Sequence, residues 1–126
     1  MKQLAIFILF LISVSSCRQK PIDMGANFDT AAFSSDRKAC EGKRELLSPQ
    51  LEIVKDSLLG YGENKLTATL GRYDLQMLDK RNQKVFIYFL AAGPQCAGNV
   101  SNARTMAVYF NATKLVKEIT FQEGIL

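Results

Sequence analysis

The chain has 126 residues, which is enough for one domain with a modest core. Its 16 lysines and arginines outnumber 12 acidic residues, but the net charge of +4 is mild and the basic residues form no dense patch. We therefore expect a solvated basic surface and no nucleic-acid partner. The sequence contains no histidine, which excludes a Ser-His or Cys-His catalytic pair and a histidine metal site.

The first residues have the pattern of an export signal. Lys2 supplies a positive charge, and residues 4–12 form an apolar run, too short for a bilayer core that needs about 20 helical residues. Residues 14–17, Val-Ser-Ser-Cys, resemble the lipobox of bacterial lipoproteins, whose cysteine carries diacylglycerol. The pattern predicts that residues 1–16 are a signal peptide and that lipid on Cys17 anchors the mature protein to a membrane. An ordinary signal peptide with a chance cysteine is the alternative.

The residues after Cys17 indicate a destination and a tether. In lipoproteins an aspartate at the next position favours the inner membrane, so Arg18 favours the outer membrane. No acidic run of the kind that directs some lipoproteins to the cell surface follows, and we expect the periplasmic face, with the surface as the alternative. Pro21, Gly25 and the lack of an apolar period predict a lipidated tether over residues 17–27 and a folded domain over residues 28–126.

Helical signals come first in this domain. Asp29 is a candidate N-cap for one or two turns over residues 30–33. Residues 41–59 are the main helical candidate, because leucines and a valine recur there at helical spacing. Pro49 falls inside this segment, and it predicts either a break or kink near Ser48 or a new helix that Ser48 caps.

The hydrophobic period changes from helical to alternating after a second helix. That helix is expected over residues 63–70, with Gly71 ending it in the left-handed conformation. Strands are then predicted at residues 74–78, 85–90, 105–110 and 115–121. The expected fold class is α+β, with two N-terminal helices packed on one face of a three- to four-stranded antiparallel meander.

Two cysteines remain once Cys17 carries lipid. Cys40 and Cys96 form an even pair in a small exported domain, which is typical of a disulfide. A metal pair and a redox pair are the alternatives, but the chain has no histidine and the two cysteines are not in a Cys-x-x-Cys spacing.

Short strings in the domain carry a family resemblance. They are residues 28–29 (Phe-Asp), 40–44 (Cys-Glu-Gly-Lys-Arg), 58–60 (Leu-Leu-Gly) and 70–74 (Leu-Gly-Arg-Tyr-Asp), and together they resemble the SmpA/OmlA lipoprotein family. That family includes the small accessory lipoprotein of the outer-membrane β-barrel assembly machinery. The resemblance implies a BLIP-like two-layer sandwich and a cysteine-bearing branch of the family. Tyr73 stands where the family usually has proline, and Gly62 where a threonine or serine commonly caps the second helix.

The strands have more apolar surface than two helices can cover. Residues 85–90 are apolar on both faces, so one face of the sheet should remain a semi-apolar patch of the kind that marks a protein contact. The candidate interface residues are Phe86, Tyr88 and Tyr109.

These features together predict a non-enzymatic, lipid-anchored interaction or scaffold protein with an envelope protein partner and no cofactor. A role as an accessory factor in envelope or outer-membrane protein assembly is implied by the resemblance. The alternative is a BLIP-like inhibitor or ligand-binding protein that acts on a periplasmic hydrolase. A small hydrolase is a third hypothesis, which the missing histidine disfavours.

Overall fold

The structure is a computed structural model that describes residues 19–98 and 102–125. Three α-helices come first in this part of the chain, and two 3-10 helices lie between them: α2 (Thr30–Ser35), η1 (Arg37–Ala39), α3 (Lys43–Val54), η2 (Lys55–Leu58) and α4 (Glu63–Leu70). Four strands follow: β1 (Leu75–Leu78), β2 (Lys84–Phe89), β3 (Arg104–Phe110) and β4 (Val116–Glu123). Helices followed by an antiparallel sheet confirm the predicted α+β class.

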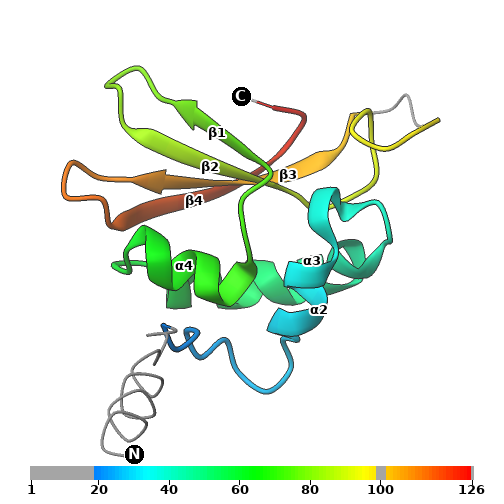
Figure 1. Cartoon of the computed structure of the whole chain (residues 1–126), viewed down its shortest axis with the longest axis horizontal. Helices are drawn as coiled ribbons and strands as arrows, with labels where there is room; N and C mark the ends of the chain where they lie inside the picture. Colours follow the sequence, from blue (N-terminus) through cyan, green and yellow to red (C-terminus); the bar gives the residue numbers. More distant parts are fainter. Residues whose placement is uncertain (1–18, 99–101, 126) are drawn as a thin grey trace, which may run out of the picture.

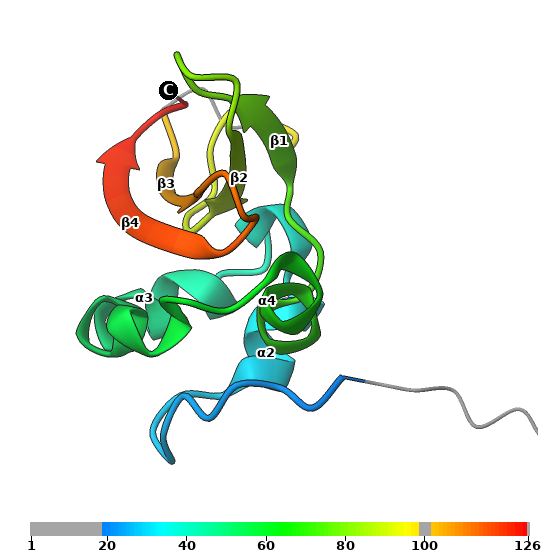
Figure 2. The same cartoon turned by 90° about the vertical axis from the view of Figure 1, so that its left-hand side faces the viewer.

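The sheet is a simple meander. Its strands lie in the order β1-β2-β3-β4, and every neighbouring pair is antiparallel. The helices pack on one face of this sheet as a second layer (Figure 1). Viewed from the side, β4 bends strongly, so that the sheet is curved rather than flat (Figure 2). The register between β3 and β4 shifts at Tyr109/Phe110, a bulge of the kind that accompanies bending.

Polar side chains close the two hairpins at the ends of the sheet. Between β1 and β2, the Asp79 carboxylate accepts hydrogen bonds from the backbone N–H groups of Arg81 and Gln83. The bond from Gln83 is the main reason that the pKa of the Asp79 carboxyl is lowered. Between β3 and β4, the Asn111 side chain accepts in the same way from Thr113 and Leu115. Local side-chain bonds of this type are typical of tight turns.

The start of α2 agrees with the prediction from the sequence, whereas the course of α3 around Pro49 differs from it. Asp29 caps α2 as predicted, because its carboxylate accepts a hydrogen bond from Ala32 N. The predicted break at Pro49 is wrong: α3 continues through it, and Ser48 is not a cap. Proline removes a single bond, to the carbonyl of Glu45, and both residues are exposed, so that water can replace the missing donor.

Gly71 ends α4 where the chain passes close to α2. Its φ is +80°, and its N–H donates to the Thr67 carbonyl. A Cβ atom at this position would lie 2.8 Å from the Cβ of Ser34 in α2. Only glycine meets both conditions, a positive φ and a backbone approach without room for a side chain.

The core lies between the helix layer and the inner face of the sheet, which we define as the face toward the helices. The sheet contributes alternate residues of β2 and β3, and the helices contribute buried leucines. The core side chains include Phe86, Tyr88 and Leu90 from β2 and its end, Met106, Val108 and Phe110 from β3, and Leu51, Leu58, Leu66 and Leu70 from the helical segments. Burying each large apolar side chain stabilises the fold by about 1.5–3 kcal/mol.

Part of the predicted tether belongs to this core. Ile22 and Met24 are buried against the helix layer, and Ile22 N donates to the hydroxyl of Thr69 in α4 at 2.7 Å. The segment differs from a free linker because two apolar side chains, spaced by two positions, reach the same surface.

We predict that Ile22→Ala lowers the free energy of unfolding by about 2–4 kcal/mol, since it removes buried methyl groups and leaves a cavity. Asn27→Ala, an exposed change in the same stretch, is the control and should stay within about 0.5 kcal/mol of the wild type. The measurement is a urea titration of both variants. Equal midpoints for the two would show that the segment adds nothing to the domain.

Candidate functional site

A disulfide joins the helix layer to the loop that follows β2. Cys40 and Cys96 are bonded, and they lie 56 positions apart in the sequence with their Cα atoms 5.7 Å apart. This is the pairing expected from the cysteine count. Closing a loop of that length stabilises a domain by about 4 kcal/mol in the chain-entropy model. Gln95 adds to this connection, because its side-chain amide donates to the carbonyls of Lys38 and Ala91.

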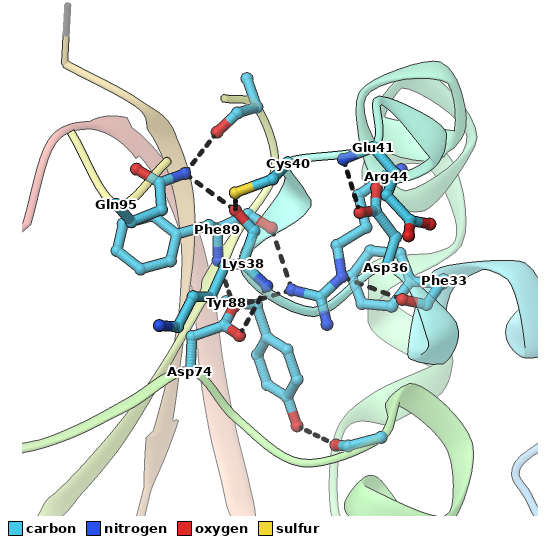
Figure 3. A network of polar contacts seen from close by, with 12 residues as sticks. Phe33, Asp36, Lys38, Cys40, Glu41, Arg44, Asp74, Tyr88, Phe89 and Gln95 are labelled. Carbon is cyan, nitrogen blue, oxygen red and sulfur yellow. Dashed lines mark hydrogen bonds and ion pairs between the residues drawn. The ribbon is translucent and has the colours of Figure 1, made fainter. Parts of the chain in front are cut away.

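A fully buried arginine, Arg44, follows Cys40 by four residues and is surrounded by polar groups (Figure 3). Arg44, in the first turn of α3, donates through Nε to the Phe33 carbonyl at 2.9 Å. Its Nη1 atom donates to Asp74 Oδ2 at 2.7 Å and to the Phe89 carbonyl at 3.2 Å. The guanidinium also lies 4.6 Å from the ring centroid of Phe33 and 5.7 Å from that of Tyr88. One side chain therefore connects α2, α3, β2 and the segment before β1.

Two buried carboxylates complete this cluster, which we name the Arg44 cluster (Asp36, Arg44 and Asp74). Asp74 accepts hydrogen bonds from the backbone N–H groups of Lys38 and Phe89 in addition to the arginine. Asp36 accepts from the N–H groups of Glu41 and Arg44, and so it caps α3 from outside the helix. This remote cap replaces the missing one, because the N-cap residue Gly42 has no side chain to offer.

The Arg44 cluster has a structural role, because it holds the helix layer against the sheet. The side chains of Arg44 and Asp74 have no exposed surface, so no substrate can reach either of them without unfolding the helix–sheet contact. Moving charges out of water is costly, and the pair is tolerated because hydrogen bonds satisfy both Asp74 oxygens and the Nε and Nη1 atoms of Arg44, whereas Nη2 has no partner. Arg44 and Asp74 lie in the two strings at residues 40–44 and 70–74 that carry the family resemblance. The buried ion pair therefore gives these strings a structural role.

Two of the three predicted interface residues are wrong. Phe86 and Tyr88 lie on the inner face of the sheet, where Tyr88 has no exposed surface at all. The Tyr88 hydroxyl donates to the Gly71 carbonyl at 2.9 Å, and burial raises the pKa of this phenol well above its ordinary value. These aromatic rings pack under the helices, and they are core because the helices cover that face.

The third predicted interface residue lies on the opposite face of the sheet. Tyr109 packs beside a second apolar group on that face, whose buried members are Val85, Ile87 and Ala107. Met77, paired with Val85 across β1 and β2, is half-buried there, and Leu75 is exposed. We name this surface the outer face (Leu75, Met77, Val85, Ile87, Ala107 and Tyr109). Val85, Ile87 and Ala107 have no exposed surface, so the part of the predicted semi-apolar patch that reaches solvent is limited to Leu75, Met77 and Tyr109, and Tyr109 is its only aromatic residue.

A surface groove lies where the chain enters the domain. Its volume is about 490 Å³, and its walls include Gln19, Tyr61, Lys65, Lys114 and Leu115. We name it the entry groove. Hydrogen bonds from Gly60 N to the Val116 carbonyl, and from Val116 N to the Tyr61 carbonyl, join its two walls.

Charge in the entry groove is mainly positive. Lys65 Nζ lies 5.3 Å from the ring centroid of Tyr61. Glu63 also lines the groove, but its carboxylate pairs with Lys84 at 2.9 Å. The lysine charges of Lys65 and Lys114 are thus available to an anionic ligand.

Among residues 19–98 and 102–125, no three histidine, cysteine or acidic side chains come together in a way that could hold a metal ion. No helix within the same residues is both long and apolar enough to cross a membrane. Cys17, the predicted lipidation site, lies outside the described residues.

In comparisons with known proteins, no protein-family model, no curated protein and no solved structure matches the chain.

Sequence reasoning missed the Arg44 cluster. The solvated basic surface expected from the composition includes Arg44, and for this residue the expectation is wrong, because Arg44 has no exposed surface. Two acidic residues are the signal that could have found it: Asp36 lies eight positions before Arg44, and Asp74 ends the string at residues 70–74. A lone arginine flanked by two such carboxylates can form a buried pair as well as a surface cluster.

We predict that Arg44→Met lowers the free energy of unfolding by about 3–5 kcal/mol, because it leaves the buried Asp74 carboxylate without its counter-ion. Arg37→Met makes the same chemical change at an exposed position and should alter stability by less than about 0.5 kcal/mol. Denaturant titration of both variants measures the difference. If Arg44→Met were as stable as Arg37→Met, the cluster would not be what joins helices to sheet.

Proposed function

We propose that the protein is a lipid-anchored, non-enzymatic interaction module of the bacterial envelope, held by lipid on Cys17 at the periplasmic face of the outer membrane. The observation that carries the proposal is the lipobox-like tetrad at residues 14–17, which lies only two positions before the first described residue, Gln19. The disulfide between Cys40 and Cys96 supports it, because such bonds persist in oxidising compartments outside the cytoplasm.

The outer face supports the interaction part of the proposal. It presents Leu75 and the half-buried Tyr109 and Met77 on the side of the sheet that the helices leave uncovered. Aromatic and methionine side chains of this kind are enriched in the centres of protein interfaces. An envelope protein that covers this face would remove from water the apolar surface that the domain itself does not bury.

The role in outer-membrane protein assembly remains part of the proposal. It derives from the resemblance of the strings at residues 40–44 and 70–74 to the SmpA/OmlA family. Crosslinking in membranes followed by purification would distinguish it from the alternative. Recovery of barrel-assembly proteins favours an assembly role, and recovery of a single periplasmic hydrolase favours an inhibitor.

Lipidation gives the first test. We predict that Cys17→Ser removes fatty-acid label from the protein and releases it from the membrane fraction as uncleaved or mis-sorted precursor, because the thiol that takes the lipid is gone. The control is the double variant Cys40→Ser/Cys96→Ser, which removes two thiols but keeps Cys17 and should retain its label. Metabolic labelling with a fatty-acid probe measures both. Equal labelling of the Cys17→Ser chain and the wild type would rule out the lipid anchor.

The outer face gives the second test. We predict that Tyr109→Ala weakens binding to the crosslinked envelope partner by about thirtyfold, the effect of losing an interface anchor worth about 2 kcal/mol. It should destabilise the domain less than Tyr88→Ala, which removes a fully buried ring at about 3–5 kcal/mol. Leu46→Ala, at an apolar residue 85% exposed on α3, is the control for a different surface. Unchanged partner recovery with Tyr109→Ala would place the contact elsewhere.

A further inference from the structure

The connection between the predicted lipid and the folded domain is very short. Gln19, two residues after Cys17, already lines the entry groove, and Ile22 is already buried in the core. A fully extended chain spans at most about 3.6 Å per residue, so Gln19 can lie no more than about 7 Å from the Cα of the lipidated cysteine. The bond from Ile22 N to Thr69 fixes the next part of the chain against α4.

This distance between Cys17 and Gln19 is similar to the thickness of the headgroup layer of a bilayer. A hydrocarbon core of about 30 Å within a membrane of about 40–45 Å leaves about 5–8 Å for the headgroups on each side. Lipid on Cys17 places that cysteine at the boundary of this layer, and two residues cannot carry the groove far beyond it. The groove and the adjoining surface of α4 must therefore lie at the membrane, whereas the outer face lies on the far side of the sheet from the chain entry (Figure 1).

The chemistry of the entry groove fits this position. Lys65 and Lys114 bring positive charge that the neighbouring Glu63 does not neutralise, because that carboxylate is paired with Lys84. Tyr61 and Leu115 line the same groove and are 38% and 39% exposed. Lysines with an aromatic and an aliphatic side chain are the residues that favour a membrane interface, where cations meet phosphates and the rings lie at headgroup depth.

We propose that the entry groove docks on the phospholipid headgroup layer of the membrane that holds the lipid on Cys17, with Lys65 and Lys114 binding lipid phosphates. This inference rests on the proposed lipid anchor. It adds a second, non-covalent contact that fixes the orientation of the domain: α4 faces the membrane, and the outer face with Tyr109 points away from it toward a protein partner.

The test uses the mature lipidated chain added to preformed vesicles of phosphatidylethanolamine and phosphatidylglycerol. A trace phospholipid carries a photoactivatable group beside its headgroup, and the crosslinked peptides are mapped by mass spectrometry. We expect crosslinks within residues 59–65 and 111–115, and none in the β1–β2 turn. The variant Lys65→Gln/Lys114→Gln should lower their yield at least about fivefold, as expected when basic residues are removed from an anionic surface.

A matched variant and the mass of the N-terminal peptide make the outcome decisive. Lys38→Gln/Lys80→Gln removes the same charge from exposed positions outside the groove and should leave the crosslinks unchanged. Lipid on Cys17 together with crosslinks on the exposed Leu46 and Ile53 of α3, or with no crosslink to the domain, would overturn the docking and leave the anchor intact. An N-terminal peptide without lipid would overturn both.

Discussion

The contact between the helix layer and the sheet depends on the guanidinium of Arg44. It is the only fully buried cationic side chain among the described residues, and it bonds to the end of α2, to the segment before β1 and to the last residue of β2. The apolar core packs the two layers together but does not fix how they are aligned, because dispersion and the hydrophobic effect have little directionality. Directed hydrogen bonds at one buried point supply that alignment. The disulfide at Cys40 and the remote cap from Asp36 hold the same corner of the molecule.

Local signals in the sequence were sufficient for most of the fold. Alternating apolar residues located the strands to within a residue or two, and Asp29 and Gly71 marked helix ends because each has a backbone role that few residues can take. The error at Pro49 has a physical reason as well. The cost of a proline inside a helix depends on whether the freed carbonyl reaches water, and this depends on tertiary burial that a single sequence does not show.

The candidate sites were harder to predict, because they depend on which of two similar surfaces becomes buried. β2 is apolar on both faces, so alternation alone could not tell whether Tyr88 or Ile87 lies under the helices. Composition alone could not separate Arg44 from the exposed basic residues around it. The stretch from Gln19 to Ile22 resembled a linker, since the burial of Ile22 depends on a surface that α4 provides. In each case the missing information was a long-range contact.

Ionisation of the buried Tyr88 hydroxyl changes the ultraviolet absorbance of the protein, and this change follows unfolding without an added label. The chain contains four tyrosines and no tryptophan, so its near-ultraviolet spectrum is a tyrosine spectrum. Burial holds the pKa of Tyr88 above that of a solvated phenol, and so this ring keeps its proton in the folded protein at a pH where it ionises in the unfolded chain. The folded state then binds more protons than the unfolded state, and its stability falls as the pH rises above about 10. The appearance of the Tyr88 tyrosinate absorbance therefore reports the pH at which the helices part from the sheet.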